Sequence, residues 1–420
     1  VSRSSGTCLI ERTMVNRFKI ALLVIIAIIA LLANGESNAA RKKTFVSVAA
    51  GTHDRQETVV SFPLPVGFKG GAYALRDTSG ELIPLQIDSD RNASFVLPAL
   101  KAGETKTYQL IMAGSNSVWT VTRRSDALDL RRVGLSVFSF VTTPAALPDN
   151  NIKPVFLRGG YIHPVFTPSG RLVTDDYPSD HYHHHGIWFA WTKTEFEGAH
   201  PDFWNVGDKT GRVEFEAVDG VSNGAVYAGF KSRQRYVALT GATPKIALNE
   251  QWDVRVYDVG RWTNKPYFLF DIVATQQCAS TSPLILEEYR YGGMGVRGHR
   301  NWQDKSKVSF LTSEGKGRLD GNATRARWVH MSGLVDNETV GIAVLDHPGN
   351  FRSPQPLRIH PDDPYFNYAP SQLGRFEIKP GEKFVFRYRF VVADGAADKK
   401  ELDRLWTDYA VPPQVSLELK

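Results

Sequence analysis

Hydrophobic and polar residues alternate along much of the chain with a period of two, which is typical of strands rather than helices. In the first part, the alternating segments are residues 44–48, 57–62, 94–97 and 106–110, and turns at Gly67, Gly80 and Gly103 separate several of them. Short alternating segments between glycine turns are typical of a β-sandwich. Residues 40–118 are therefore expected to form a small N-terminal β-domain.

Longer strand-like segments follow at residues 212–217, 224–232, 235–239, 246–257, 267–276 and 377–391. They predict a main β-sandwich domain over residues 119–395. Helical spacing is found at residues 396–409, so residues 396–420 are expected to form a C-terminal helical cap and tail. The expected fold class is all-β, a large β-sandwich with a small N-terminal β-domain and a short C-terminal helix.

The first 39 residues have a different pattern. A short basic stretch with Arg17 and Lys19 follows Met14 and precedes an apolar run at residues 20–33, and Ser37-Asn38-Ala39 fits a small-x-small cleavage site. These features predict a signal peptide over residues 1–39 and a periplasmic or secreted protein. The apolar run is shorter than the roughly 20 residues of a membrane-spanning helix. An uncleaved N-terminal membrane anchor is the alternative.

Cleavage after Ala39 would remove Cys8 and leave Cys278 as the single cysteine, so no intramolecular disulfide is expected. It would also remove four of the 50 basic and two of the 44 acidic residues, which leaves a net charge of +4. Neither a Lys/Arg run nor an RNA-binding motif is present, so no nucleic-acid partner is expected. Membrane contact is expected only through an uncleaved N-terminal segment.

The chemistry of the chain is concentrated in residues 175–191. Four of the eleven histidines, His181, His183, His184 and His185, lie within five residues. Pro178-Ser179-Asp180 is typical of a turn, and the apolar, aromatic residues 187–191 predict a buried strand after it. Imidazoles beside carboxylates can bind a metal or move a proton near neutral pH.

Two arrangements of these histidines remain open at the sequence level: they lie either on the turn or on a segment that is already extended. If the segment is already extended, His181, His183 and His185 share one face, while Tyr182 and His184 share the other, because side chains alternate along a strand. A single histidine could simply be a hydrogen-bonded core residue. Four polar rings are costly to bury without partners, which favours a functional pocket.

Two later segments could contribute to the same pocket. Residues 287–300 combine acids, glycines and arginines and include Glu288 and Arg297, without the P-loop pattern or a following helix. The alternative is a glycine-rich hairpin with surface charges. Further on, Asp346-His347-Pro348 places a carboxylate beside an imidazole at a strand end, and Arg352 lies in the loop that follows.

Several motifs together resemble the secreted bacterial family labelled "methane oxygenase PmoA" or PmoA-like, over about residues 45–395. The motifs that carry the resemblance are Tyr161-Ile162-His163-Pro164, Asp180-His181-x-His183-His184-His185-Gly186, Asp202-Phe203-Trp204, Tyr291-Gly292-Gly293-x-Gly295-x-Arg297 and Asp346-His347-Pro348. The resemblance implies a fold similar to the mutarotase-like β-supersandwich, and it assigns no catalytic roles. Methane oxidation is not inferred, because the chain has one short apolar run and cleavage would leave Ala40, not a histidine, as the first residue.

The first hypothesis is a carbohydrate-active enzyme, either a lyase, a hydrolase or an epimerase, with a small-molecule or polysaccharide substrate. Tryptophan rings can stack on a pyranose, and arginine can bind hydroxyl or carboxylate groups. The expected catalytic residues are His181, His183, His184, Glu288 and His347. The expected substrate-binding residues are Tyr161, His163, His185, Trp188, Trp204, Arg297 and Arg352.

A second hypothesis is a metal-dependent oxidoreductase or hydrolase. Two histidines and one carboxylate, His181, His183 and either Asp202 or Asp180, would then bind a divalent metal. A third is a glycan-binding protein without catalysis. Under each hypothesis, imidazoles packed this closely are expected to titrate as a coupled group around about pH 6.5, with at least one pKa lowered. Binding or turnover is therefore expected to change steeply between about pH 5 and pH 7.

Overall fold

The structure, a computed structural model, describes residues 43–420 apart from 69–71, 115, 145 and 261–264. The signal peptide expected over residues 1–39 lies outside the described residues. Residues 46–417 form one compact unit, and the described part of a second unit comprises residues 43–45 and 418–420 at the ends of two strands. Within the described ranges, no helix is both long and apolar enough to cross a membrane.

A seven-stranded sheet contains most of the first 70 described residues and one C-terminal strand, in the order β2-β5-β4-β3-β6-β1-β26. Its strands are β1 (Thr44–Ala49), β2 (Arg55–Pro63), β3 (Ala72–Arg76), β4 (Leu82–Ile87), β5 (Asn92–Leu100), β6 (Thr105–Met112) and β26 (Gln414–Leu419). Buried Val60, Leu75, Phe95 and Tyr108 belong to its hydrophobic core. Residues 414–419, expected to be part of a tail, are thus a strand of this sheet.

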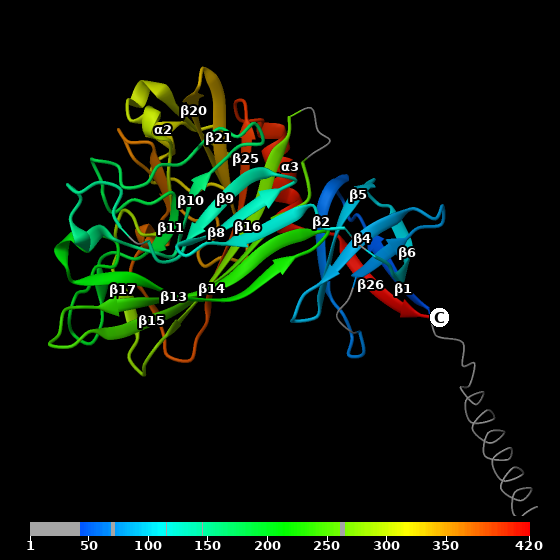
Figure 1. The fold of residues 1–420 in the computed structure, drawn as a ribbon, viewed down its shortest axis with the longest axis horizontal. Coiled ribbons are helices and arrows are strands. Elements are labelled where there is room, and N and C mark those ends of the chain that lie inside the picture. Colours follow the sequence, from blue (N-terminus) through cyan, green and yellow to red (C-terminus); the bar gives the residue numbers. More distant parts are fainter. Residues whose placement is uncertain (1–42, 69–71, 115, 145, 261–264) are drawn as a thin grey trace, which may run out of the picture. The chain divides into compact units, whose positions relative to one another are not determined.

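Two eight-stranded sheets build the rest of the fold (Figure 1). One has the order β22-β23-β18-β11-β10-β9-β8-β7, and the other has the order β13-β14-β15-β16-β25-β21-β20-β19. The first is built from β7 (Trp119–Arg123), β8 (Ala127–Arg132), β9 (Leu135–Val141), β10 (Tyr161–Val165), β11 (Ile187–Ala190), β18 (Gly293–Arg297), β22 (Leu357–Ile359) and β23 (Tyr365–Tyr368). The second is built from β13 (Gly211–Asn223), β14 (Tyr227–Ala238), β15 (Lys245–Tyr257), β16 (Tyr267–Cys278), β19 (Val308–Thr312), β20 (Trp328–Val335), β21 (Glu338–Asp346) and β25 (Phe384–Asp394).

These two sheets pack face to face through aromatic side chains. Phe138 contacts Phe270 with ring centroids 5.0 Å apart, and Phe140 contacts Phe230 at 4.5 Å. The alternating pattern of the sequence explains this packing, because every second side chain of a strand points to the same face. The expected all-β sandwich is confirmed, while its mutarotase-like character stays a prediction.

A three-stranded sheet, short helices and one longer helix complete the described chain. The sheet has the order β12-β17-β24 and consists of β12 (Thr194–Glu195), β17 (Leu284–Leu286) and β24 (Phe376–Ile378). The helices are η1 (Pro154–Phe156), η2 (Val206–Asp208), η3 (Arg300–Trp302), η4 (Lys305–Lys307), η5 (Pro370–Leu373), α2 (Arg318–Gly321) and α3 (Lys399–Ala410). The side chain of Asp398 caps the N-terminus of α3 by accepting a hydrogen bond from the backbone N–H of Glu401, and Leu402 and Leu405 face the core. The C-terminal helix expected at residues 396–409 is therefore confirmed, shifted by one to three residues at its ends.

Candidate functional site

The four clustered histidines lie on a turn that leads into β11, not on an extended strand. The backbone N–H of His181 donates to the carbonyl of Pro178 at 2.9 Å, and that of His184 donates to the carbonyl of His181 at 2.8 Å. The turn expected at Pro178-Ser179-Asp180 therefore continues through His184, and the buried strand expected after it begins at Ile187. Because the segment turns, the alternating-face arrangement of the histidines does not apply.

Burial divides the cluster into an outer and an inner pair. His181 and His183 are partly exposed, whereas His184 and His185 are buried. Burial, followed by the charge of neighbouring imidazoles, lowers the pKa of His183 to about 3 and that of His184 well below the usual value. The expected lowering of at least one pKa is confirmed. The titration expected for the cluster around pH 6.5 is wrong for His183, because burial keeps this ring neutral across that range.

The inner histidine His185 ends a chain of hydrogen bonds. Its Nδ1 lies 2.7 Å from Oδ1 of Asp176, and Oδ2 of Asp176 accepts a hydrogen bond from the hydroxyl of Tyr161 at 2.8 Å. The rings of Tyr161 and Tyr177 contact the His185 ring at 4.6 and 4.7 Å between centroids. Asp176, which is held by the Tyr161 hydroxyl, therefore orients His185, and Tyr161 also packs against its ring.

Arg297 joins the turn to the neighbouring strand β18. Its side chain is fully buried, and its Nη2 donates to both carboxylate oxygens of Asp180 at 2.9 Å and to Oε1 of Gln303 at 2.6 Å. Its Nη1 lies 3.3 Å from Nδ1 of His184. Since a guanidinium can only donate, Nδ1 of His184 accepts and Nε2 carries the proton of this neutral ring.

Aromatic side chains form the floor beneath the histidines. The His184 ring packs against His181 at 4.7 Å, Tyr365 at 4.6 Å and Trp188 at 5.0 Å between centroids. Trp204 in turn contacts Trp188 at 4.9 Å. Both tryptophans are buried, so the rings expected to stack on a sugar instead support the histidine turn.

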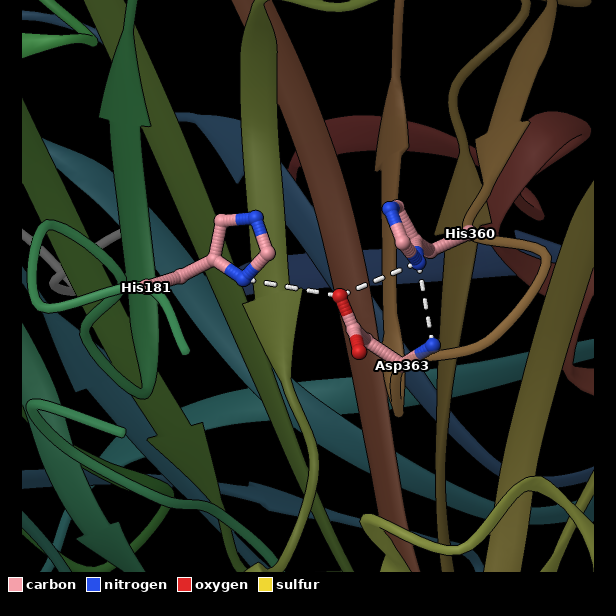
Figure 2. Close-up of side chains that lie close together, drawn as sticks. All are labelled: His181, His360 and Asp363. Carbon is pink, nitrogen blue, oxygen red and sulfur yellow. Dashed lines mark hydrogen bonds and ion pairs between the residues drawn. The ribbon is translucent and has the colours of Figure 1, made fainter. Parts of the chain in front are cut away.

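A second segment, the loop after β22, meets the outer histidines. Nδ1 of His181 and Nδ1 of His360 lie 3.4 and 3.0 Å from the same oxygen, Oδ2 of Asp363. Figure 2 shows both rings turned toward this carboxylate from separate segments of the chain. The ligand atoms of His181, His360 and Asp363 all lie within 4.8 Å of one another. Two histidines and one carboxylate match the donors that Zn, Fe(II) and Mn(II) accept.

The hydrogen bonds around this group leave one oxygen without a donor. Nδ1 of His360 accepts the backbone N–H of Asp363 at 3.0 Å and that of Asp362 at 3.3 Å, so it carries no proton to donate. Nδ1 of His181 lies closer to Asp180, at 2.8 Å from Oδ2. Oδ2 of Asp363 is buried and has no hydrogen-bond donor among the described residues. A buried carboxylate oxygen facing two ring nitrogens is suited to a cation, which would replace the two backbone N–H groups as the partner of Nδ1 of His360.

The other expected site residues lie apart from this group. The two Asp202 carboxylate oxygens accept hydrogen bonds from Thr192, Asn205 and the backbone of Trp204 and Asn205, so they order a local loop. The metal set of His181, His183 and Asp202 therefore does not assemble: His181 remains, and His360 and Asp363 complete the group instead. His163 is near the inner pair, where its Nδ1 lies 2.9 Å from Oγ1 of Thr174.

Glu288, His347 and Arg352 are not brought to the histidines either. Glu288 is exposed on the loop after β17. The His347 ring packs against Tyr409 of α3 at 4.9 Å, and Arg352 donates to the backbone carbonyls of Pro370 and Gly374. Among the described contacts, none joins these three side chains to the clustered histidines.

His360 and Asp363 were missed by sequence reasoning. The segment Ile359-His360-Pro361-Asp362-Asp363 does contain the signal, a histidine and an acid three residues apart in a turn after an apolar strand. Such a pair is common on protein surfaces. Its importance depends on lying beside His181, which is far away in sequence.

Comparison with solved structures found a similarity to a protein in the glycosyl hydrolase family 38 from Enterococcus faecalis, with 9% sequence identity and a TM-score of 0.38. The similarity covers 91% of this chain and 48% of that one, so the chain spans about half of that protein's length. At this distance the likeness carries no argument. No curated protein matches the chain.

Comparison with family models matched residues 127–407 to a family of unknown function, DUF6807. Its description does not mention the PmoA-like family, so that resemblance stays a prediction. The matched range includes the histidine turn, Arg297, His360 and Asp363, and it covers more than half of the chain. The chain therefore belongs to the DUF6807 family.

Proposed function

We propose that the protein is an exported, cation-dependent enzyme that acts on a carbohydrate. In this proposal His181, His360 and Asp363 hold a divalent cation, and the neighbouring His183 accepts a proton. The observation that carries it is Oδ2 of Asp363, a buried oxygen that has no hydrogen-bond donor in the described part of the chain and faces the Nδ1 atoms of two histidines. Nδ1 of His181 carries no proton when it binds the cation, so the ring would carry its proton on Nε2 instead of sharing it with Asp180.

The chemistry of this arrangement fits the lyases, hydrolases and epimerases expected from the sequence. A divalent cation can polarise a substrate oxygen or lower the pKa of a bound water. His183 is partly exposed, its ring contacts that of His181 at 5.5 Å, and its lowered pKa keeps it neutral. A neutral imidazole can accept a proton from water or from the substrate. Arg297 and Asp180 then position the turn and do not touch the substrate.

The metal part of the proposal is tested by elemental analysis of protein purified without a polyhistidine tag. The wild type, loaded with Zn, Mn or Fe(II) and desalted, should retain about one equivalent. Asp363→Asn should weaken binding at least about tenfold, because the neutral amide removes the charge that the cation requires. Asp362→Asn is the matched control, since this neighbouring carboxylate is exposed and pairs with Lys305. Retention by Asp363→Asn equal to that of the wild type would contradict the site.

The carbohydrate part requires a separate measurement. The loaded protein is incubated with a panel of oligosaccharides, and the products are identified by mass spectrometry with and without chelator. A product that forms only with the cation supports the proposal. Saturable binding without any product would instead favour the glycan-binding alternative.

A further inference from the structure

A small pocket lies beside the proposed cation site. It has a volume of about 290 Å³ and is lined by residues from the loop after β17, the loop after α2, β22 and η5, namely Glu288, Tyr289, Arg290, Asn322, Ala323, Arg358 and Gln372. Arg358 precedes His360 by two residues on β22. Since Leu357 and Ile359 are buried, Arg358 projects from the other face of the strand. The pocket therefore adjoins the segment that carries the proposed cation site.

Arg358 is held in this pocket without an anionic partner. Its side chain is partly buried, its Nε has no acceptor among the described residues, and its one hydrogen bond is a long one of 3.5 Å from Nη1 to Asn322. Partly burying a cation without a counter-ion is costly.

The second arginine is Arg290, which lines the same pocket. Its guanidinium lies over the rings of Tyr289 and Tyr291, 5.7 Å from each centroid, and no ion pair holds it among the described residues. Both guanidiniums are positively charged and line one pocket, so they repel each other. Among the described residues, Glu288 is the single carboxylate that lines the pocket, and no hydrogen bond or ion pair joins it to either guanidinium. Other arginines nearby are satisfied, for example Arg375 by Glu287.

We propose that this pocket binds the anionic group of the substrate, so that the enzyme acts on an acidic carbohydrate. A carboxylate or sulfate would neutralise Arg358 and Arg290 together and accept their N–H groups, while the adjoining sugar ring reaches the cation. This inference rests on the proposed function and names its substrate class.

The test measures binding of a trigalacturonate and of its fully methyl-esterified form by calorimetry. The two ligands differ in charge and share the same sugar rings. A sulfated trisaccharide and its unsulfated counterpart form a second pair, which distinguishes a carboxylate from a sulfate. All titrations are repeated in EDTA, because a carboxylate could also bind the cation directly.

In EDTA, the wild type should bind one of the acidic ligands at least about tenfold more tightly than its neutral counterpart. Arg358→Gln and Arg290→Gln should each remove most of this preference, because each deletes a charged donor. Arg375→Gln should retain it, since Arg375 pairs with Glu287 and does not line the pocket.

Equal affinity for charged and neutral ligands, or no binding of either acidic trisaccharide, would overturn the inference. A preference that disappears with EDTA and is unchanged in Arg358→Gln would also overturn it, and would leave the cation site supported. If the preference depends on Arg358 but elemental analysis shows that protein loaded with metal and desalted, without EDTA, retains none, the pocket is supported and the cation-dependent function is contradicted.

Discussion

At the scale of single residues, Arg297 holds the histidine turn in place. It is fully buried, and its strongest interactions are with Asp180, which precedes the first histidine of the cluster. Burial alone would raise the pKa of Asp180, but the hydrogen bonds from His181, Gln303 and Arg297 and the positive charge of Arg297 hold it below its usual range. The pair therefore remains ionised and fixes the position from which His181 reaches Asp363.

Replacing Arg297 by Met should destabilise the protein by about 3 kcal/mol, because it leaves Asp180 partly buried without its cation. Urea unfolding measures this loss. The double variant Arg297→Met/Asp180→Asn should be less destabilised than the sum of the two single changes, since they remove partners of one interaction. Strict additivity would show that the ion pair does not hold the turn.

These residues also show what the sequence could reveal about the site. Four polar rings within five residues are a strong local signal, and a functional pocket was predicted from it, while the turn was predicted only at Pro178-Ser179-Asp180. Asp202 looked equally suitable, but its oxygens are used by neighbouring N–H and hydroxyl groups. Spacing along the chain cannot distinguish a carboxylate that is occupied locally from one that faces a distant histidine. His360 and Asp363 were missed for the same reason.

At the scale of elements, helix α3 is attached to the sheets by a buried ion pair. Nη1 of Arg55 in β2 donates to Oδ1 of Asp408 at 2.9 Å, and the two side chains are 1% and 3% exposed. Thr58 donates to the other Asp408 oxygen at 3.0 Å. The helix was predicted from its apolar spacing, whereas its partner lies 353 residues away in sequence and could not be predicted.

Asp408→Ala should lower the free energy of unfolding by about 3–5 kcal/mol, because it leaves Arg55 buried without a counter-charge. Glu401→Ala on the same helix is the control. Glu401 pairs with Arg404 at a partly exposed position, and Arg404 keeps its ion pair with Asp408 when Glu401 is removed, so the loss should cost about 1 kcal/mol or less. Chemical denaturation of the two variants measures the two losses of unfolding free energy. Equal losses would mean that the buried Arg55–Asp408 pair contributes no more than the Glu401–Arg404 pair.

At the scale of the whole molecule, a polar bridge crosses the aromatic core between the two eight-stranded sheets. Nε1 of Trp191, just after β11, donates to Oε1 of Gln276 in β16 at 2.8 Å. Nε2 of Gln276 donates to Oε1 of Glu250 in β15 at 2.7 Å, and the Tyr236 hydroxyl lies 3.4 Å from the same oxygen. The alternation of the sequence predicted two packed sheets, but it could not show that a carboxyl group lies between them.

Burial raises the pKa of Glu250 to about 7, even though Gln276 and the charge of Arg158 act to lower it. In the unfolded chain this carboxyl has its ordinary pKa of about 4.3. The folded state therefore keeps its proton over a range in which the unfolded state loses it. The contribution of Glu250 to stability is fully present below about pH 4, decreases as the pH rises, and is lost above about pH 7.

Glu250→Gln should remove this dependence, because the amide has nearly the same shape and can still accept the hydrogen bond from Gln276. The unfolding free energy of the variant minus that of the wild type should increase by about 3 kcal/mol between pH 4 and pH 8, at 1.36 kcal/mol per pKa unit. Urea unfolding at several pH values measures it, with Glu338→Gln, an exposed position at the start of β21, expected to follow the wild type. A difference that stays constant with pH would mean that Glu250 is solvated or paired well enough to ionise normally, and that the core between the sheets is less dry than its packing indicates.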